Sequence, residues 1–298
     1  MSTFLRFLSL VSAIFFATAS TSMAASGHDH LPPSAEEVFS IGSFVVTNSM
    51  IMVWVVAAFL ILIAQLATKN ISLVPKGFQN FIEWIVESLL DFLGGILGEK
   101  LARRTFWFFA TIFIMILASN WMGLLPGVGT VGWFLSGDAM DPNDTFRPFL
   151  RGGNADLNMT GAMAITFAIL WFYWSITETS LKDFGAHIFA PKGNFKGLMM
   201  IGMIVIFFAV GLIEVFSIAL RPVALMFRLY GNVYAGENML ESIMNTVPVP
   251  WLKWLAALPF YFLELLVGLI QALVFTLLCA VFLKLMCDHG DHDEEHAH

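Results

Sequence analysis

Five long apolar segments restrict this chain, more than any other feature, to folds that cross a lipid bilayer. They cover residues 39–67, 105–125, 160–176, 199–246 and 250–286. A helix needs about 20 apolar residues to cross the hydrocarbon core, and lipid cannot hydrogen-bond the backbone of any other open structure. We therefore predict an all-α membrane protein with about five transmembrane helices.

The low content of charged residues supports this interpretation. Charged residues make up 12% and hydrophobic residues 58% of the 298 residues, whereas a soluble domain carries about 25% charged residues. The net charge of −7 arises mainly at the ends and in the loops, and no basic tract indicates a nucleic-acid partner. The surplus apolar surface needs a lipid bilayer around it.

Both cysteines, Cys279 and Cys287, lie near the end of the last apolar segment. On one helix they are about 12 Å apart, at about 1.5 Å per residue. A disulfide requires Cα atoms within about 7 Å of each other. We therefore expect two free thiols.

Both ends of the chain fall outside the predicted membrane domain, residues 39–286. Residues 1–24 resemble a secretory signal peptide, with a basic start, a short apolar core and a small-residue cleavage site. A first membrane anchor is the alternative. Residues 25–38 form a polar external segment in either case. Residues 287–298 form a His- and Asp-rich cytoplasmic tail, which we interpret as a solvated end rather than a metal site.

Residues 75–103 differ from the five spans because charged residues interrupt the apolar ones. The apolar side chains that recur there at helical spacing are Phe78, Phe81, Ile82, Ile85, Leu89, Leu93, Ile96 and Leu97. Glu83, Glu87, Asp91 and Lys100 fill other positions. This pattern predicts an amphipathic helix that lies on a membrane surface or against other helices.

Basic residues in the short loops predict the orientation, because Lys and Arg concentrate on the cytoplasmic side. Those between spans one and two and between spans three and four are Lys69, Lys76, Lys100, Arg103, Arg104, Lys182, Lys192 and Lys196. The opposite side carries Arg147, Arg151 and Lys253, with aspartates nearby. We expect the N-terminus outside the cytoplasm and the C-terminus inside it.

Polar side chains within apolar spans are costly in lipid and are therefore candidates for function. The fourth span contains Glu214, Arg221, Arg228, Asn232 and Glu237, and the fifth contains Glu264 and Gln271. Arg228 lies near the middle of its span and stays protonated, so it needs a partner charge or a water-filled cleft. A structural ion pair and snorkelling to the surface are the alternatives, and snorkelling suits Arg221 better.

The last two spans are longer than a perpendicular crossing needs, which indicates tilt or bending. Two prolines within residues 247–251 mark the turn between them, so the spans form a long tilted antiparallel hairpin. Its register sets Gln271 level with Arg228, and Glu264 level with Glu237.

Distances along the hairpin then suggest a path for an ion. The two glutamates lie toward the outside, about 13 Å beyond Arg228 along the helix, and Glu214 lies about 21 Å before it, toward the cytoplasm. Polar residues would thus lead from one side of the membrane to a fixed cation in the middle, and a carboxylate would lie toward the other side. We also expect the paired glutamates to share a proton. The alternative is that one glutamate faces the channel and the other faces lipid headgroups or another helix.

At this point the sequence resembles a known family, subunit a of F-type ATP synthases. The segment from Arg228 to Glu237, Arg-Leu-Tyr-Gly-Asn-Val-Tyr-Ala-Gly-Glu, closely matches its signature, and Pro222-Val-Ala-Leu leads into it. Further matches are Gln271-Ala-Leu-Val-Phe, the segment from Asn154 to Thr160, and Asn120 with Leu124-Leu-Pro126. They follow one another in order over most of residues 40–286.

The resemblance implies a role for each matching residue. Arg228 would face the essential carboxylate of the rotor ring. The residues implied to line the half-channel from outside are Asn232, Glu237, Glu264 and Gln271, with Asn120 contributing. Glu214 and Ser217 would lie toward the cytoplasmic outlet. Many bacterial relatives carry His where this chain has Glu264, so both polar partners here are carboxylates.

The resemblance also implies partners and a location. The partners are the rotor ring of c subunits, the peripheral-stalk b subunits, the remainder of the ATP synthase complex, the bilayer and protons. The location is a bacterial inner membrane, and the chain would have no cofactor, no metal and no catalytic site of its own.

Two rival functions follow from the same residues. An ion-coupled secondary transporter could use Arg228 to hold an anionic substrate, but such folds usually carry internal repeats, and none is evident. A haem-bearing subunit would need axial ligands, commonly His, within its spans. The one His residue outside the two tails is His187, which lies in a loop between spans. We therefore discount a haem-bearing subunit.

Overall fold

The structure is a computed structural model that describes residues 35–287, apart from 43, 70, 73, 130, 135–145, 180–197 and 250–251. The predicted signal peptide, residues 25–34 of the external segment and residues 288–298 of the tail lie outside the described residues.

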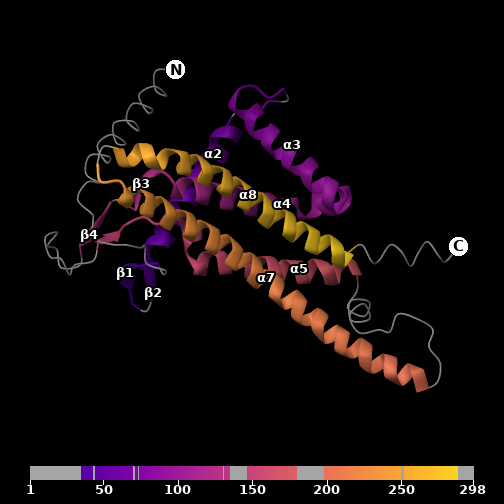
Figure 1. Ribbon diagram of the computed structural model, residues 1–298. Coiled ribbons are helices and arrows are strands. Elements are labelled where there is room, and N and C mark those ends of the chain that lie inside the picture. The colour runs from indigo at the N-terminus through magenta and orange to yellow at the C-terminus, as the bar shows by residue number, and fades with distance from the viewer. Residues whose placement is uncertain are drawn as a thin grey trace. The chain divides into compact units, whose positions relative to one another are not determined.

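Long apolar helices make up most of the described chain (Figure 1). Those long and apolar enough to cross a membrane are α2 (Asn48–Thr68), α4 (Glu99–Gly123), α5 (Leu157–Thr179), α7 (Leu198–Thr246) and α8 (Lys253–Cys287). The shorter α3 (Phe78–Leu97) is the amphipathic helix. The predicted fold class, an all-α membrane protein with about five spans and one amphipathic helix, is confirmed.

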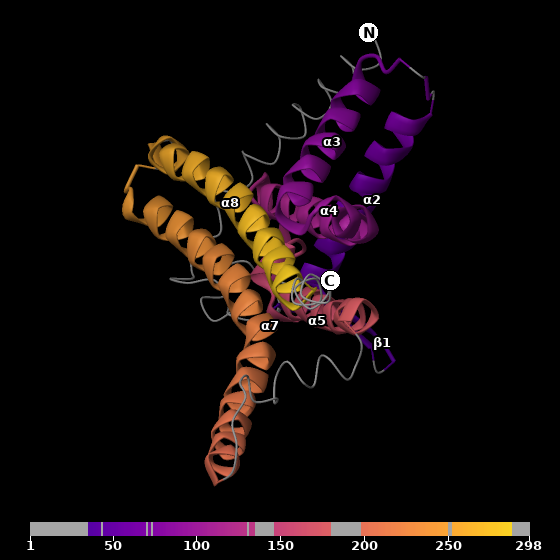
Figure 2. The same cartoon turned by 90° about the vertical axis from the view of Figure 1, so that its right-hand side faces the viewer.

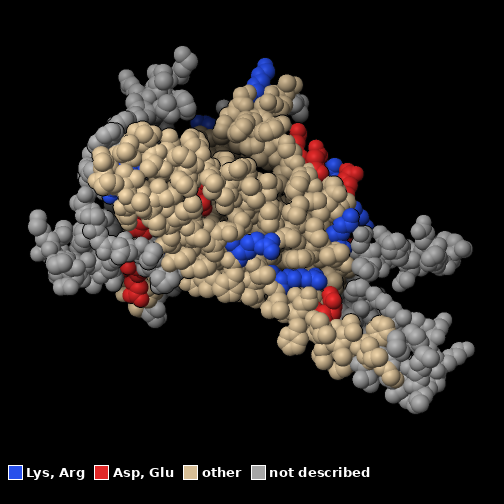
Figure 3. Space-filling view, in the orientation of Figure 1, with Lys and Arg blue, Asp and Glu red and all other residues tan. Residues whose placement is uncertain are grey.

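Apolar side chains cover the outside of these helices. Ile213 on α7 is 69% exposed and Ile61 on α2 is 58% exposed. The face shown in Figure 3 is largely uncharged, with few acidic or basic groups among the described residues. An apolar surface of this extent is rare on soluble monomers, so its natural surrounding is lipid.

The first span begins later than the sequence suggested. Residues 39–47 were expected to be helical, but β1 (Glu37–Ile41) and β2 (Phe44–Thr47) form an antiparallel hairpin. The run of aromatic and β-branched residues in β2 favours a strand. The Thr47 hydroxyl then accepts a hydrogen bond from the Met50 amide at 3.4 Å and caps α2.

The amphipathic helix ends earlier than expected. The apolar spacing suggested one helix over residues 75–103, but α3 stops at Leu97 and residues 99–103 begin α4. Gly98 separates the two helices with a φ of +80°, a left-handed conformation that glycine adopts without a steric penalty. The apolar periodicity did not reveal this break.

The segment between α4 and α5 contains short ordered elements. They are β3 (Pro126–Gly129), β4 (Gly132–Phe134), β5 (Phe146–Pro148) and the 3-10 turn η2 (Gly153–Ala155). Strands β4 and β5 pair antiparallel. The sequence had indicated only a loop here, because a 3-residue strand is too short to show a periodic pattern.

The last two helices are unusually long. Helix α7 has 49 residues, or about 74 Å at about 1.5 Å per residue, and α8 has 35 residues. The C-terminal part of α7, from Leu229, and the first part of α8 lie side by side and antiparallel (Figures 1 and 2). This part of the pair forms the predicted hairpin.

The chain divides into two compact units, each assembled from several segments. Unit 1 comprises residues 1–83, 112–159 and 229–273. In it, the turn η2 packs against α2, where Gly153 leaves room for Val53. Its buried apolar residues include Met52 and Ile116.

Unit 2 comprises residues 84–111, 160–228 and 274–298. Its core contains an aromatic cluster of Phe108, Phe109, Phe167 and Trp174. The exposed ring of Trp107 packs edge-on against Trp174. The indole of Trp171 donates a hydrogen bond to the Phe282 carbonyl at 3.0 Å, which ties α5 to α8. Cys279 is buried and both cysteines are free thiols, as predicted.

Candidate functional site

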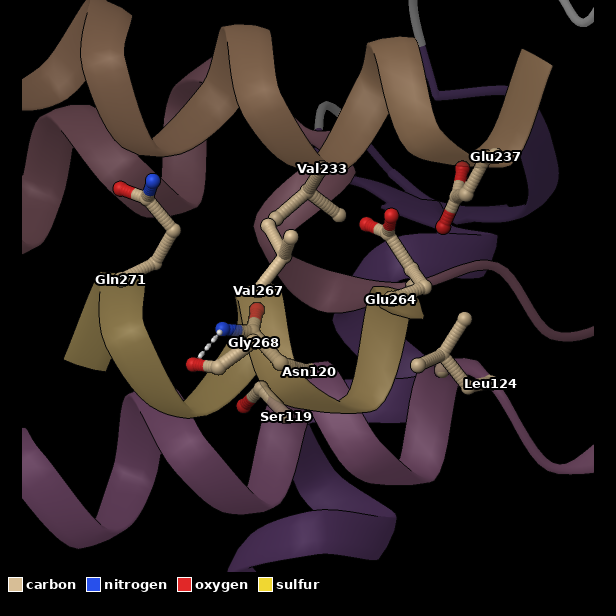
Figure 4. Close-up of a pocket in the computed structure, with 11 residues that line it drawn as sticks. Ser119, Asn120, Leu124, Val233, Glu237, Glu264, Val267, Gly268 and Gln271 are labelled. Atoms are coloured by element: carbon tan, nitrogen blue, oxygen red, sulfur yellow. Dashed lines mark hydrogen bonds between the residues drawn. The ribbon is translucent and has the colours of Figure 1, made fainter. Parts of the chain in front are cut away.

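A small polar pocket lies in unit 1, between α4, α7, α8 and the turn that precedes α5 (Figure 4). Its lining residues are Ser119, Asn120, Gly123, Leu124, Gly152, Val233, Glu237, Glu264, Val267, Gly268 and Gln271. The structure thus places around one pocket several residues that the sequence had singled out separately: Asn120, Glu237, Glu264 and Gln271.

Two carboxylates from facing helices meet in this pocket. Glu237 comes from α7 and Glu264 from α8, and their carboxyl groups point toward one another (Figure 4). The hairpin register had set these two residues at one depth. Carboxylic acids that lie this way can hold, release and exchange a proton, provided that their side chains have space to move.

Glycines supply the space that the two carboxylates occupy. The Glu264 carboxyl group fills the position that a Cβ at Gly236 would take. A Glu237 oxygen fills the corresponding position at Gly152. Each glutamate therefore lies directly against backbone without a side chain.

Asn120 connects three elements around the pocket. Its amide nitrogen donates to the Gly268 carbonyl on α8 at 3.0 Å, and its amide oxygen accepts from Asn154 at 2.7 Å. Asn154 also donates to the Ile116 carbonyl at 3.2 Å. Trp121 donates to the Leu265 carbonyl at 3.1 Å. These bonds hold α4 against α8 and η2 against α4. Asn120 is 5% exposed, so water has little access to compete for them.

The segment around η2 is anchored by buried polar contacts on its other side. Ser49 at the start of α2 donates to the Asp156 carboxylate at 2.5 Å, and Asp156 also accepts from the Asn158 amide at 3.0 Å. Asn48 donates to the Pro148 carbonyl at 3.1 Å. This anchoring fixes the segment that covers Glu237.

Arg151 is a buried arginine that the sequence did not single out. It was counted only as an external loop charge, but its side chain is buried, with 4% exposed. It precedes Gly152, the residue against which Glu237 packs. Only the folded loop reveals that Gly152 lies beside Glu237, because no sequence spacing relates residues 152 and 237.

Arg228 and Asn232 lie one helical turn apart on α7, and both side chains are exposed. Neither lines the pocket. A cation exposed at the middle of a long apolar helix requires a partner charge or water beside it. The described residues form no ion pair with Arg228 within 4.0 Å.

In unit 2, Glu214 pairs with Arg221 on α7, at 3.4 Å between a carboxylate oxygen and Nη2. The Arg221 guanidinium also lies over the Phe282 ring, 5.0 Å from its centroid. The Arg221 side chain is 19% exposed, so these contacts favour the structural ion pair for this residue. Ser217, between them in sequence, is exposed.

Comparison with known proteins identifies the family. A model of the family described as ATP synthase A chain matches residues 50–284. The chain belongs to the ATP synthase A chain family. It is 29% identical over 246 residues to ATP synthase subunit a of Solidesulfovibrio magneticus, with 83% of this chain and 87% of that protein covered. It is 28% identical over 257 residues to ATP synthase subunit a of Anaeromyxobacter sp., with 84% of this chain and 56% of that protein covered.

Membership of the ATP synthase A chain family indicates what the chain does. Members of this family are proton-translocating membrane subunits of F-type ATP synthases. The matched range includes every residue singled out from the sequence, from Asn120 to Gln271. The resemblance to this family that the sequence motifs indicated is confirmed.

Proposed function

We propose that this chain is the stationary proton-translocating subunit of a rotary F-type ATP synthase. It provides two half-channels to a rotor ring, with Arg228 between them. The observation that carries this proposal is the pocket of two facing glutamates inside an otherwise apolar helical protein of the ATP synthase A chain family. Carboxylates within apolar spans are too costly in a membrane to be retained for packing alone.

The inlet half-channel uses the pocket of unit 1. Glu237 and Glu264 accept protons from the outer side and pass them onward, while Gln271 and Asn232 offer polar groups along the way. Asn120 acts mainly by holding α4 and α8 together, since both ends of its amide are hydrogen-bonded. The half-channel toward the cytoplasm passes Ser217 and Glu214, which is 45% exposed.

Arg228 separates the two half-channels. A guanidinium stays charged at any physiological pH, so it repels protons that would otherwise pass directly between the half-channels. It also favours the ionised form of a rotor carboxylate opposite it. Its exposure on α7 leaves it available to such a partner.

The partners that this function requires are a rotor ring of c subunits, peripheral-stalk b subunits and the catalytic remainder of the complex. The chain itself has no catalytic site for ATP. We place it in a bacterial inner membrane, with its N-terminus outside and its C-terminus in the cytoplasm. Protease protection of tags at the two ends tests the orientation, and a C-terminus cleaved from outside would contradict it.

Arg228→Ala tests the proposal directly. We expect the variant to assemble into the complex but to lose ATP-driven proton pumping in inverted membrane vesicles. Arg221→Ala is the matched control, because that arginine is already paired with Glu214, and its loss should reduce pumping far less. Normal coupled pumping by Arg228→Ala would refute the proposed function. The secondary-transporter alternative predicts instead solute uptake without the other ATP synthase subunits.

A further inference from the structure

We propose that Trp121 is a positioning residue of the inlet, which sets the place of the Glu264 carboxyl group by holding the adjacent backbone of α8. The inference rests on the proposed function, because it assigns a further residue to the same half-channel. Trp121 does not line the pocket and carries no proton itself. It acts on proton transport through Glu264.

A hydrogen bond ties the indole of Trp121 to α8. The indole N–H donates to the Leu265 carbonyl at 3.1 Å, and Leu265 directly follows Glu264 in the chain. A helical carbonyl oxygen has a second lone pair, so it can accept this bond in addition to the one within its helix. Tryptophans near the end of a span commonly anchor it among lipid headgroups, but this N–H is directed to a carbonyl of the protein.

A second contact, three residues further along α8, prevents that helix from turning about the first. The Asn120 amide donates to the Gly268 carbonyl at 3.0 Å. A Cβ at Gly268 would lie 3.1 Å from the Asn120 Cβ and 3.6 Å from the Trp121 Cδ1, so the absence of a side chain lets both residues reach the α8 backbone. Positions 265 and 268 are neighbours on a helix surface. Two bonds at this spacing fix both the rotation of α8 and its position along α4.

Glu264 lies where a small movement of α8 would matter. Its carboxyl group fills the position that a Cβ at Gly236 would take, and it points toward that of Glu237 (Figure 4). A slip of α8 by one residue would move Glu264 by about 1.5 Å and turn it by about 100°. Misplacement of a reacting group by about 1 Å can lower a rate by about 100-fold. The bonds from α4 therefore keep the two carboxyl groups facing each other.

Trp121→Phe isolates the role of this hydrogen bond. Phenylalanine keeps an aromatic ring and lacks the N–H. The Leu265 carbonyl retains its bond within α8, so no group loses its last partner and the cost to stability is small. Trp107→Phe is the matched control, because Trp107 is 59% exposed on the same helix and its indole N–H has no hydrogen-bond partner among the described residues.

The first measurement is ATP-driven proton pumping in inverted vesicles that contain the whole complex, normalised to the amount of assembled complex. We expect Trp121→Phe to pump about fivefold more slowly than the wild type, which corresponds to the loss of one ordinary hydrogen bond, and Trp107→Phe to pump within about twofold of the wild type. Equal rates of Trp121→Phe and Trp107→Phe would overturn the proposal.

Dependence on Glu264 distinguishes positioning from a general structural role. In a Glu264→Gln background, Trp121→Phe should change the pumping rate by less than about twofold, because the effects of residues that act through one another are not additive. The amide of a glutamine carries no proton, so its exact position matters less. A loss of about fivefold in both backgrounds would show that Trp121 acts independently of Glu264, and the proposal would be wrong.

A disulfide reports the position of α8 without any proton transport. Gly236→Cys/Glu264→Cys is prepared with Cys279→Ala and Cys287→Ala, and the rate of disulfide formation is measured under mild oxidation. Trp121→Phe should lower this rate by about fivefold, because the bond forms only when the two Cβ atoms lie close together, whereas Trp107→Phe should leave it unchanged.

An unchanged rate of disulfide formation in Trp121→Phe overturns the proposal, even where Glu264→Gln pumps too slowly for a comparison. The same measurement separates the two hypotheses. Normal pumping by Arg228→Ala would refute the proposed function, whereas the disulfide decides the role of Trp121 in either case.

Discussion

Substitution of Gly236 by alanine should leave the protein folded and impair proton transport. A Cβ at this position would occupy the space of the Glu264 carboxyl group. That group is the far end of a flexible side chain, so it can swing aside. The variant therefore displaces one carboxylate of the pair without removing any ionisable group.

The expected magnitudes come from two opposing terms. Alanine in place of a helix-interior glycine stabilises a helix by about 1 kcal/mol, whereas overpacking costs about 1–3 kcal/mol. The net change in the free energy of unfolding should thus lie between about 0 and 2 kcal/mol of destabilisation. Misplacement of a reacting group by about 1 Å can lower a rate by about 100-fold, so we expect a loss of pumping of at least about tenfold.

Gly202→Ala is the matched control. Gly202 lies in the same helix, and a Cβ there would meet nothing within 4 Å. It therefore receives the same gain in helix propensity without moving Glu264. ATP-driven pumping in inverted vesicles, normalised to the amount of assembled complex, compares the two variants. Equal pumping by Gly236→Ala and Gly202→Ala would refute the idea that the position of the Glu264 carboxyl group matters.

Two further predictions concern the same pocket. Glu237→Gln and Glu264→Gln should each slow pumping. In a double-mutant cycle their effects on the activation free energy of pumping should be non-additive by more than about 0.5 kcal/mol, because neighbouring residues couple. Additive effects would contradict a shared proton. Asn120→Ala should destabilise the protein by about 1–3 kcal/mol in chemical denaturation, because it leaves buried partners unsatisfied. Ser119→Ala is its control, because the Ser119 hydroxyl has no hydrogen-bond partner among the described residues, and an equal loss in both variants would be inconsistent with the bracing role.

The sequence predicted the membrane fold well because hydropathy depends only on local composition. The apolar run within α2 identifies a span without any knowledge of its neighbours. The ends of the spans were harder, since they depend on single residues. Hydropathy alone placed the start of the first span at residue 39, but residues 39–47 belong to the hairpin of β1 and β2 that precedes α2. The break between α3 and α4 depends on the left-handed backbone conformation of Gly98, which the apolar spacing does not show.

The part of the site formed by α7 and α8 alone could be predicted from the sequence. Only a few residues separate α7 from α8 in the sequence, so residue number relates directly to depth and the register could set Glu237 level with Glu264. No such relation exists for a loop. Gly152 approaches Glu237 only after η2 has packed against α2 and α4. That packing depends on contacts between segments far apart in the sequence, such as that between Ser49 and Asp156.

The glycines of the pocket explain why polar residues alone did not define it. A search for function in a membrane protein looks for ionisable groups, yet two of the groups that shape this pocket are positions without side chains. Gly152 makes room for Glu237 and Gly236 for Glu264, so each glutamate has a glycine from another segment opposite it. A carboxyl group that must alternate between protonated and ionised forms needs room to turn, and close packing of a protein interior normally denies it. In this pocket, therefore, the space beside the carboxylates belongs to the site as much as the carboxylates do.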